Sequence, residues 1–76
     1  MENMTLNRIG EVLQEKGRNN KWLAKELGVH KNTVSKWVQN VQQPHLVIFL
    51  QISVLLGCDI RELIVSTGPK PKGSAN

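Results

Sequence analysis

A segment of twenty residues limits the fold of this chain more than any other feature of its sequence. The segment is NKWLAKELGVHKNTVSKWVQ, residues 20–39. Leu23, Ala24 and Leu27 recur in it at the spacing of one face of a helix. Gly28 follows directly, and glycine readily adopts the left-handed backbone conformation that ends many helices. The pattern predicts a short helix over about residues 20–27 that stops at a tight turn.

A second helix is predicted after the turn, over about residues 31–39. Val34 and Trp37 lie three positions apart, so both can point inward, and Val29 is expected to be buried after the turn. Ala24 is small, which lets the second helix cross closely over the first. This order of apolar residues, small residue, glycine and second apolar pair is typical of a helix-turn-helix.

The chain resembles the phage-repressor and Cro-type helix-turn-helix proteins, also called the xenobiotic-response-element family, over about residues 5–65. The matching positions are Leu23, Ala24, Leu27, Gly28, Val29, Thr33, Val34, Trp37, Pro44, Leu46, Leu50, Ile52, Leu56, Glu62 and Leu63. The resemblance implies an all-α fold, a compact five-helix bundle of the lambda-repressor-like DNA-binding type. We expect residues 1–65 to form this one domain, because a chain of 76 residues has room for only one.

Three further helices are predicted around the motif. Their expected bounds are Thr5 or Leu6 to Lys16 and His45 or Leu46 to Leu56, followed by a short fifth helix through Ile60, Leu63 and Ile64. Gly17 and Gly57 are the expected stops of the first two, and Asp59 with Glu62 has the spacing of a capping box for the third. Asn40 is expected to adopt a left-handed conformation where the family commonly has glycine.

The end of the chain has a different composition from the rest. Residues 66–76, STGPKPKGSAN, lack apolar side chains to bury, so we expect a disordered basic tail. Its lysines, Lys70 and Lys72, either reach along a phosphate backbone or belong to an inert end.

Basic residues are concentrated around the motif. The formal net charge is +4, and the basic residues between positions 16 and 36 are Lys16, Arg18, Lys21, Lys25, Lys31 and Lys36. Glu26 is the one acid in the same stretch. A basic stripe over a helix-turn-helix is the expected electrostatic footprint of a polyphosphate partner. Double-stranded DNA is therefore the predicted partner.

In the resembled family, the second helix of the motif enters the major groove of DNA. The resemblance and the outward positions of this helix assign base contacts to Lys31, Asn32, Ser35 and Lys36. Lysine can donate to guanine O6 and N7, and asparagine can bond adenine at N6 and N7. The predicted phosphate contacts are Asn20, Lys21, Thr33 and Gln39.

Two departures from the family affect the expected strength of binding. His30 stands where serine or threonine normally caps the second motif helix, so this helix is expected to fray. The loop over residues 41–43 lacks the lysines and arginines that are frequent there, so weaker binding per monomer is expected. Asn19, by contrast, is a good cap for the first motif helix.

The predicted fourth helix, within HLVIFLQISVLLG, is apolar nearly all round. The residues expected to fill the core are Leu46, Phe49, Leu50, Ile52 and Leu56. Val47, Ile48 and Val54 would then face outward as a protein interface, most simply that of a two-fold homodimer on a palindromic operator. The alternative is an antitoxin or adaptor, in which this face binds another protein such as a toxin.

The chain contains no pattern that indicates catalysis. It has no paired carboxylates in a plausible cleft, no nucleophile with its base and no phosphate-binding glycine loop, so we expect neither enzyme activity nor a cofactor. His30 and His45 are too widely separated to suggest a metal site, and the single cysteine, Cys58, is expected to be a buried, inert thiol. The absence of a signal peptide or long apolar run favours a cytoplasmic, nucleoid-associated protein.

Overall fold

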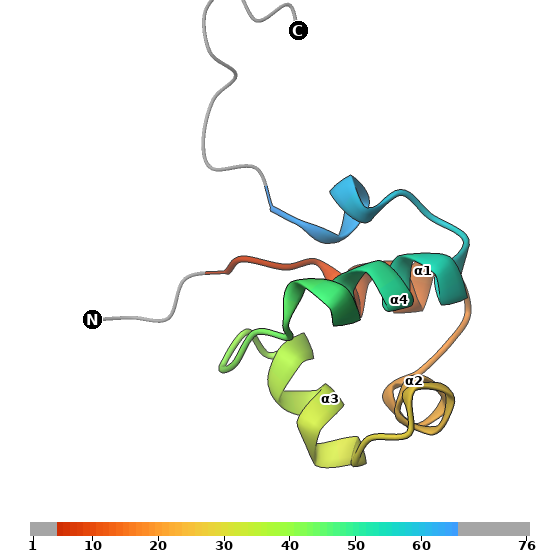
Figure 1. Ribbon diagram of the computed structural model, residues 1–76, viewed down its shortest axis with the longest axis vertical. Helices are drawn as coiled ribbons and strands as arrows, with labels where there is room; N and C mark the ends of the chain where they lie inside the picture. Colours follow the sequence, from red (N-terminus) through yellow and green to blue (C-terminus); the bar gives the residue numbers. More distant parts are fainter. Residues whose placement is uncertain (1–4, 66–76) are drawn as a thin grey trace, which may run out of the picture.

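The computed structural model describes residues 5–65, and within this range the fold is all-helical (Figure 1). Its elements are α1 (Ile9–Glu15), α2 (Asn20–Leu27), α3 (Lys31–Val38), α4 (Leu46–Leu56) and a 3-10 turn, η1 (Ile60–Leu63). The predicted helical fold is therefore confirmed, but the fifth element is one 3-10 turn and not a full helix. The tail predicted over residues 66–76 lies outside the described residues.

The predicted helix ends are confirmed by the backbone. Gly17, Gly28 and Gly57 have positive φ angles and follow α1, α2 and α4. Asn40 has φ 60° after α3, so asparagine adopts here the conformation that the sequence led us to expect. Asp59 and Glu62 form the predicted capping box, because Asp59 accepts from the backbone of η1 and Glu62 Oε2 accepts from Asp59 N–H at 3.0 Å.

The predicted start of α1 at Thr5 or Leu6 is wrong. The N–H of Val65 donates to the carbonyl of Leu6 at 2.9 Å, and the N–H of Arg8 donates to the carbonyl of Leu63 at 2.8 Å. These bonds flank a short antiparallel bridge between Asn7 and Ile64, near the two ends of the described chain. The helix begins only at Ile9, whose N–H is accepted by the side chain of Asn7 at 3.0 Å.

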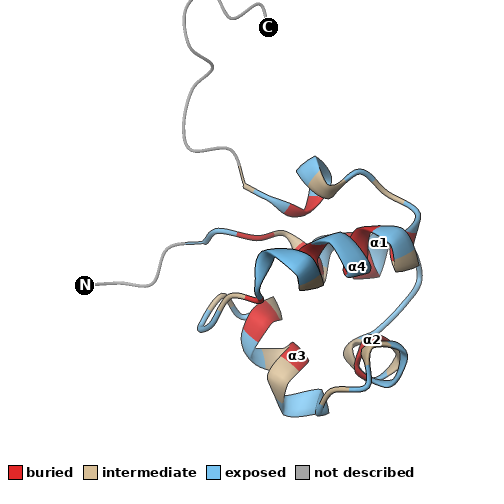
Figure 2. Ribbon diagram, in the orientation of Figure 1, coloured by how far each residue is buried: buried red, intermediate tan, exposed pale blue. Residues whose placement is uncertain are grey.

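One core lies between the helices, and every helical element contributes to it (Figure 2). The buried apolar residues are Ile9, Val12, Leu13, Leu23, Ala24, Val34, Trp37, Phe49, Ile52, Leu56 and Leu63. Val29, the predicted buried residue after the turn, is half-buried and packs against this core. The core holds α3 against α1 and α2, which fixes the side of α3 that remains outside.

The predicted inner face of α4 is partly wrong. Leu46 is 75% exposed and Leu50 is 54% exposed, although both were expected in the core. The buried face instead includes Ser53, whose hydroxyl donates to the carbonyl of Leu50 at 2.6 Å. Because this bond satisfies the hydroxyl, a serine can occupy an inward position, and α4 is rotated relative to the expected arrangement.

Candidate nucleic-acid interface

Helices α2 and α3 pack against each other and are joined by a turn that the sequence determines closely. Gly28 has φ 72°, and the N–H groups of Gly28 and Val29 donate to carbonyls in the last turn of α2, a Schellman motif. Val34 is completely buried and Trp37 nearly so, and these two residues fix the rotation of α3 about its own axis. The opposite side of α3 must then face away from the protein.

That outward side carries the residues assigned to base contacts. Lys31, Asn32 and Lys36 are exposed, whereas Ser35 is half-buried. The hydroxyl of Ser35 accepts a hydrogen bond from Nε2 of Gln39 at 3.1 Å. The structure thus gathers the four predicted base-contact residues and one predicted phosphate contact on a single face of one helix. Their contacts with DNA stay predictions.

His30 caps α3, although the sequence indicated a poorer cap at this position. Its ring nitrogen Nδ1 accepts a hydrogen bond from the N–H of Asn32 at 3.1 Å. The imidazole therefore replaces the hydroxyl that usually accepts this bond at the start of a helix. The cap orders the first turn of α3, where Lys31 and Asn32 lie.

The other predicted phosphate contacts lie beside this face or at the start of α2. Asn20 is the first residue of α2 and is half-buried, and Lys21 follows it fully exposed. Asn19 caps the helix as predicted, because its Oδ1 accepts from Trp22 N–H at 2.8 Å. Thr33 of α3 is half-buried. The start of α2 offers unpaired N–H groups and the positive end of a helix dipole, which together favour an anion.

The lysines of the motif keep their charges free for an external anion. In residues 5–65, the ion pairs join Arg8 to Glu11 and Glu15, and Arg61 to Asp59. These pairs lie on α1 and η1, so they neutralise acids outside α2 and α3. Lys31 and Lys36 are therefore unpaired within the described part of the chain, and their charges can act on phosphates.

Trp22 is a packing residue at the outer side of α2. It is half-buried against the core, and the guanidinium of Arg18 lies 4.6 Å from the centre of its ring.

Cys58 is also half-buried, so its predicted full burial is wrong in degree. Burial, together with the nearby carboxylate of Glu62, raises the pKa of the Cys58 thiol, which keeps it in the less reactive protonated form.

The predicted outward face of α4 differs from the structure at three residues, while its role as an interface stays a prediction. Val47 and Val54 are 58% and 73% exposed, but Ile48 is half-buried and packs against the core. Sequence reasoning missed Leu46 and Leu50 because it placed them in the core. We use the name α4 stripe for the exposed apolar residues Leu46, Val47, Leu50 and Val54.

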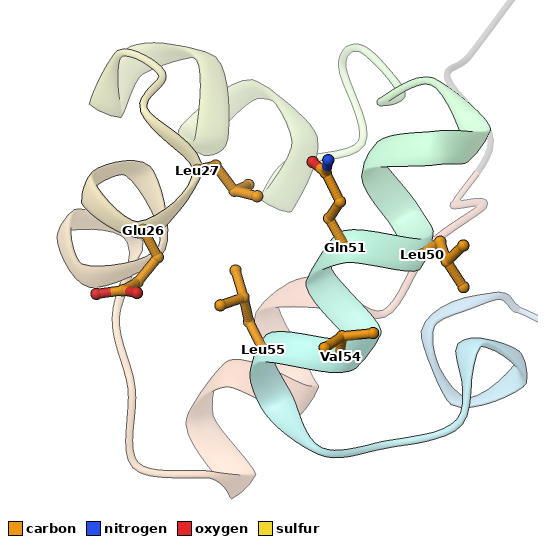
Figure 3. A pocket seen from close by; sticks show the side chains of 6 residues that line it. All are labelled: Glu26, Leu27, Leu50, Gln51, Val54 and Leu55. Atoms are coloured by element: carbon orange, nitrogen blue, oxygen red, sulfur yellow. The ribbon is translucent and has the colours of Figure 1, made fainter.

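A groove of about 430 Å³ opens between α2 and α4, next to this stripe (Figure 3). Its lining residues are Glu26, Leu27, Leu50, Gln51, Val54 and Leu55. Leu27 and Leu55 point into the space between the helices, and the carboxylate of Glu26 extends away from it. Leu50 and Val54 belong to both surfaces, so the groove and the α4 stripe form one largely apolar area.

Comparison with known proteins identifies the fold family. Residues 9–63 match the helix-turn-helix family of Cro type, which covers most of the chain. The chain belongs to this family. It is also similar to a crystal structure from Bacteroides fragilis whose protein is provisionally named as DNA-binding, with 47% identity and a TM-score of 0.79. That similarity covers 82% of this chain and 100% of the other. No protein with a curated description matches the chain.

The family match places this chain among the DNA-binding regulators of helix-turn-helix type. Over residues 5–65, the structure brings no three of the histidine, cysteine, aspartate and glutamate side chains together as a metal site. None of the helices in this range is long and apolar enough to cross a membrane.

Proposed function

We propose that the protein is a transcriptional regulator that reads a specific DNA sequence in the major groove and represses by occluding a promoter. The observation that supports this most is the face of α3 opposite Val34 and Trp37, which consists of polar and basic side chains. Lys31, Asn32 and Lys36, with Ser35 beside them, are the proposed base readers, since they offer donors suited to guanine and adenine edges.

The proposed phosphate contacts surround the base readers. They are Asn20 and Lys21 at the start of α2, and Thr33 and Gln39 on α3. Such contacts fix the position of the protein on the duplex but do not read its sequence. If about four to six phosphates are neutralised, the affinity should fall steeply with rising salt concentration.

A second copy of the chain is the proposed occupant of the α4 stripe. In a two-fold interface the same surface patch of each copy meets its counterpart, so a patch with a net charge of one sign repels its copy. Residues 46–56 of α4 contain no charged side chain, whereas the chain as a whole carries +4. The α4 stripe is therefore a face on which two copies can meet without repulsion, and its burial would remove four exposed apolar side chains from water.

The short reading helix also favours two copies. α3 has eight residues, and a helix of that length extends over about 12 Å, or roughly three to four base pairs. Two copies related by a two-fold axis would read a palindromic operator with twice that length.

The alternative proposal is an antitoxin or adaptor, in which DNA binding is secondary. The groove between α2 and α4 favours it, because a groove lined by Leu27 and Leu55 suits an apolar segment of another protein. In that case the α4 stripe and the groove would be covered by a different protein, such as a toxin.

The experiment that tests the proposal is selection from a random duplex library at moderate salt. It compares the wild type with the triple variant Lys31→Ala/Asn32→Ala/Lys36→Ala. A control, Gln14→Ala/Lys16→Ala/Lys25→Ala, likewise removes one side-chain amide and two lysines, at exposed positions outside α3. A palindromic motif recovered by the wild type and the control, but lost by the triple variant, supports the proposal. Salt-sensitive binding without any motif would refute sequence reading and favour the alternative.

Whether the protein represses or activates transcription needs a separate measurement. A promoter that carries the selected site between its recognition elements should give less transcript in vitro as the protein is added. The triple variant should leave the transcript unchanged. A rise in transcript with the wild type would contradict repression while leaving sequence reading intact.

A further inference from the structure

A cluster of three side-chain amides lies at the C-terminal end of α3. Nδ2 of Asn7 donates to the carbonyl of Trp37 at 3.0 Å and to Oε1 of Gln43 at 2.7 Å. Oδ1 of Asn40 accepts from the N–H groups of Leu6 and Asn7 at 2.8 and 2.9 Å, and from Nε2 of Gln43 at 3.2 Å. Nδ2 of Asn40 donates to the carbonyl of Asn7 at 3.2 Å.

This cluster connects the reading helix to a distant part of the chain. Asn40 follows α3 closely, and two of its partners, Leu6 and Asn7, lie in the segment before α1. The Trp37 carbonyl belongs to α3 itself and also accepts from Asn40 N–H at 3.0 Å. The amide cluster is therefore a direct link between the end of α3 and the segment over residues 6–8.

The link specifies a defined geometry because Asn7 at its centre is buried, Asn40 and Gln43 are half-buried, and all three side-chain amides are hydrogen-bonded. Asn7 is only 2% exposed, and in residues 5–65 every buried side-chain nitrogen and oxygen has a partner. A buried amide that loses a partner keeps the full cost of its removal from water, so alternative arrangements of these residues are disfavoured. Such a network defines one orientation of the elements that it joins.

We propose that Asn7, Asn40 and Gln43 are positioning residues for DNA reading, which hold α3 at the angle at which its outward face meets the groove. This inference rests on the proposed role of α3 as the reading helix. The other end of α3 is held by the turn after α2, so the amide cluster secures the end that this turn does not reach. Hydrogen bonds to base edges tolerate errors of only a few tenths of an ångström, so a small tilt of α3 changes which sequences are read.

Two substitutions at Asn40 separate the side chain from the backbone conformation. Asn40→Gly keeps the positive φ angle at low cost but removes the whole amide. Asn40→Asp keeps the oxygen that accepts from Leu6, Asn7 and Gln43, but it replaces the donor to the Asn7 carbonyl by a second acceptor oxygen. Ile48→Ala, in the half-buried part of α4, serves as the control for a loss of stability alone.

The first measurement is the ratio of affinities for the selected duplex and a scrambled duplex, at fixed salt and below each variant's unfolding temperature. We expect Asn40→Gly to lower this ratio at least tenfold, and Asn40→Asp and Ile48→Ala to stay within about threefold of the wild type. The added negative charge of aspartate weakens both complexes alike, so it cancels in the ratio. An unchanged ratio for Asn40→Gly would overturn the proposal.

The second measurement does not involve DNA. Residual dipolar couplings of the free proteins report the orientation of α3 relative to α1. We expect this orientation to change in Asn40→Gly and to persist in Asn40→Asp. If the couplings show no change in Asn40→Gly, the positioning role is wrong even where α3 reads DNA. The couplings can also change in Asn40→Gly while the wild type binds all duplexes with equal affinity. In that case α3 does not read DNA sequence, so the proposed function is wrong and so is the positioning role in reading.

Discussion

Val38 of α3 lies directly against Gly10 of α1, so closely that a Cβ on Gly10 would stand 2.8 Å from Val38 Cγ1. Glycine in the interior of a helix normally costs stability relative to alanine, by about 0.5–1 kcal/mol. Its presence in α1 is explained by this contact, because any side chain would force α1 and α3 apart. The contact and the amide cluster both connect the region of α1 to the last part of the reading helix.

We expect Gly10→Ala to lower the free energy of unfolding by about 1 kcal/mol. The added methyl group overpacks the contact, at a typical cost of about 1–3 kcal/mol, and the gain in helix propensity offsets part of it. Val38 is β-branched and has one strongly preferred rotamer in a helix, so it does not move aside easily. Urea unfolding of Gly10→Ala, Val38→Ala and the double variant tests this. If the loss of unfolding free energy in the double variant equals the sum of the losses in the two single variants, the two residues do not interact and the contact is contradicted.

The cap of α3 gives a second prediction about stability. His30→Ala removes the acceptor for the N–H of Asn32, so we expect a loss of about 1 kcal/mol in the free energy of unfolding. His30→Ser replaces one acceptor by another, and we expect it to remain within about 0.5 kcal/mol of the wild type or to exceed it. Thermal and urea unfolding would decide the point, and equal stability of His30→Ala and the wild type would show that the cap contributes little.

The motif itself was predictable because its signals are local. The bounds of α2 over residues 20–27 agree with the structure, since Asn19 and Gly28 mark its two ends in the sequence. The start of α3 at Lys31 was also predicted correctly, because the turn at Gly28 and Val29 lies just before it. The positive φ angle at Asn40 was predicted because asparagine tolerates the left-handed conformation and stands where the family commonly has glycine.

Three features were not predictable because they depend on distant residues or on uniform composition. The start of α1 is delayed by pairing with residues 63–65, which no local pattern reveals. The inward face of α4 could not be read from a helix whose residues are nearly all apolar, and its buried serine opposed the expected arrangement. The amide cluster joins residues 7, 40 and 43, which become neighbours only in the folded chain.

The capping box of η1 gives a prediction about pH. Hydrogen bonds from the Arg61 side chain, followed by one from its backbone, lower the pKa of Asp59. Because the folded-state pKa is lowered, this carboxylate stabilises the fold above the ordinary aspartate value of about 3.9, and the contribution is lost as the pH falls through the folded-state pKa. NMR titration of the Asp59 carboxyl should show a rise toward the ordinary value in Arg61→Ala. An unchanged midpoint would mean that Arg61 is not the cause.

The α4 stripe gives the prediction on which the proposed dimer depends. Leu50→Glu/Val54→Glu places four like charges across a two-fold interface, so we expect a monomer in sedimentation at micromolar concentrations where the wild type is a dimer. Both side chains are more than half exposed in the monomer, so its free energy of unfolding should change by no more than about 0.5 kcal/mol per substitution.

The control for this experiment is Gln14→Glu/Gln42→Glu, which adds the same charge at exposed positions outside the stripe and should remain dimeric. Loss of the dimer should also weaken binding to a palindromic operator much more than binding to a single half-site, because the second reading helix is no longer linked to the first. A wild type that is monomeric both free and on DNA would exclude the second copy as the occupant of the stripe. The apolar area beside the groove would then be left for a different protein, as the antitoxin or adaptor alternative requires.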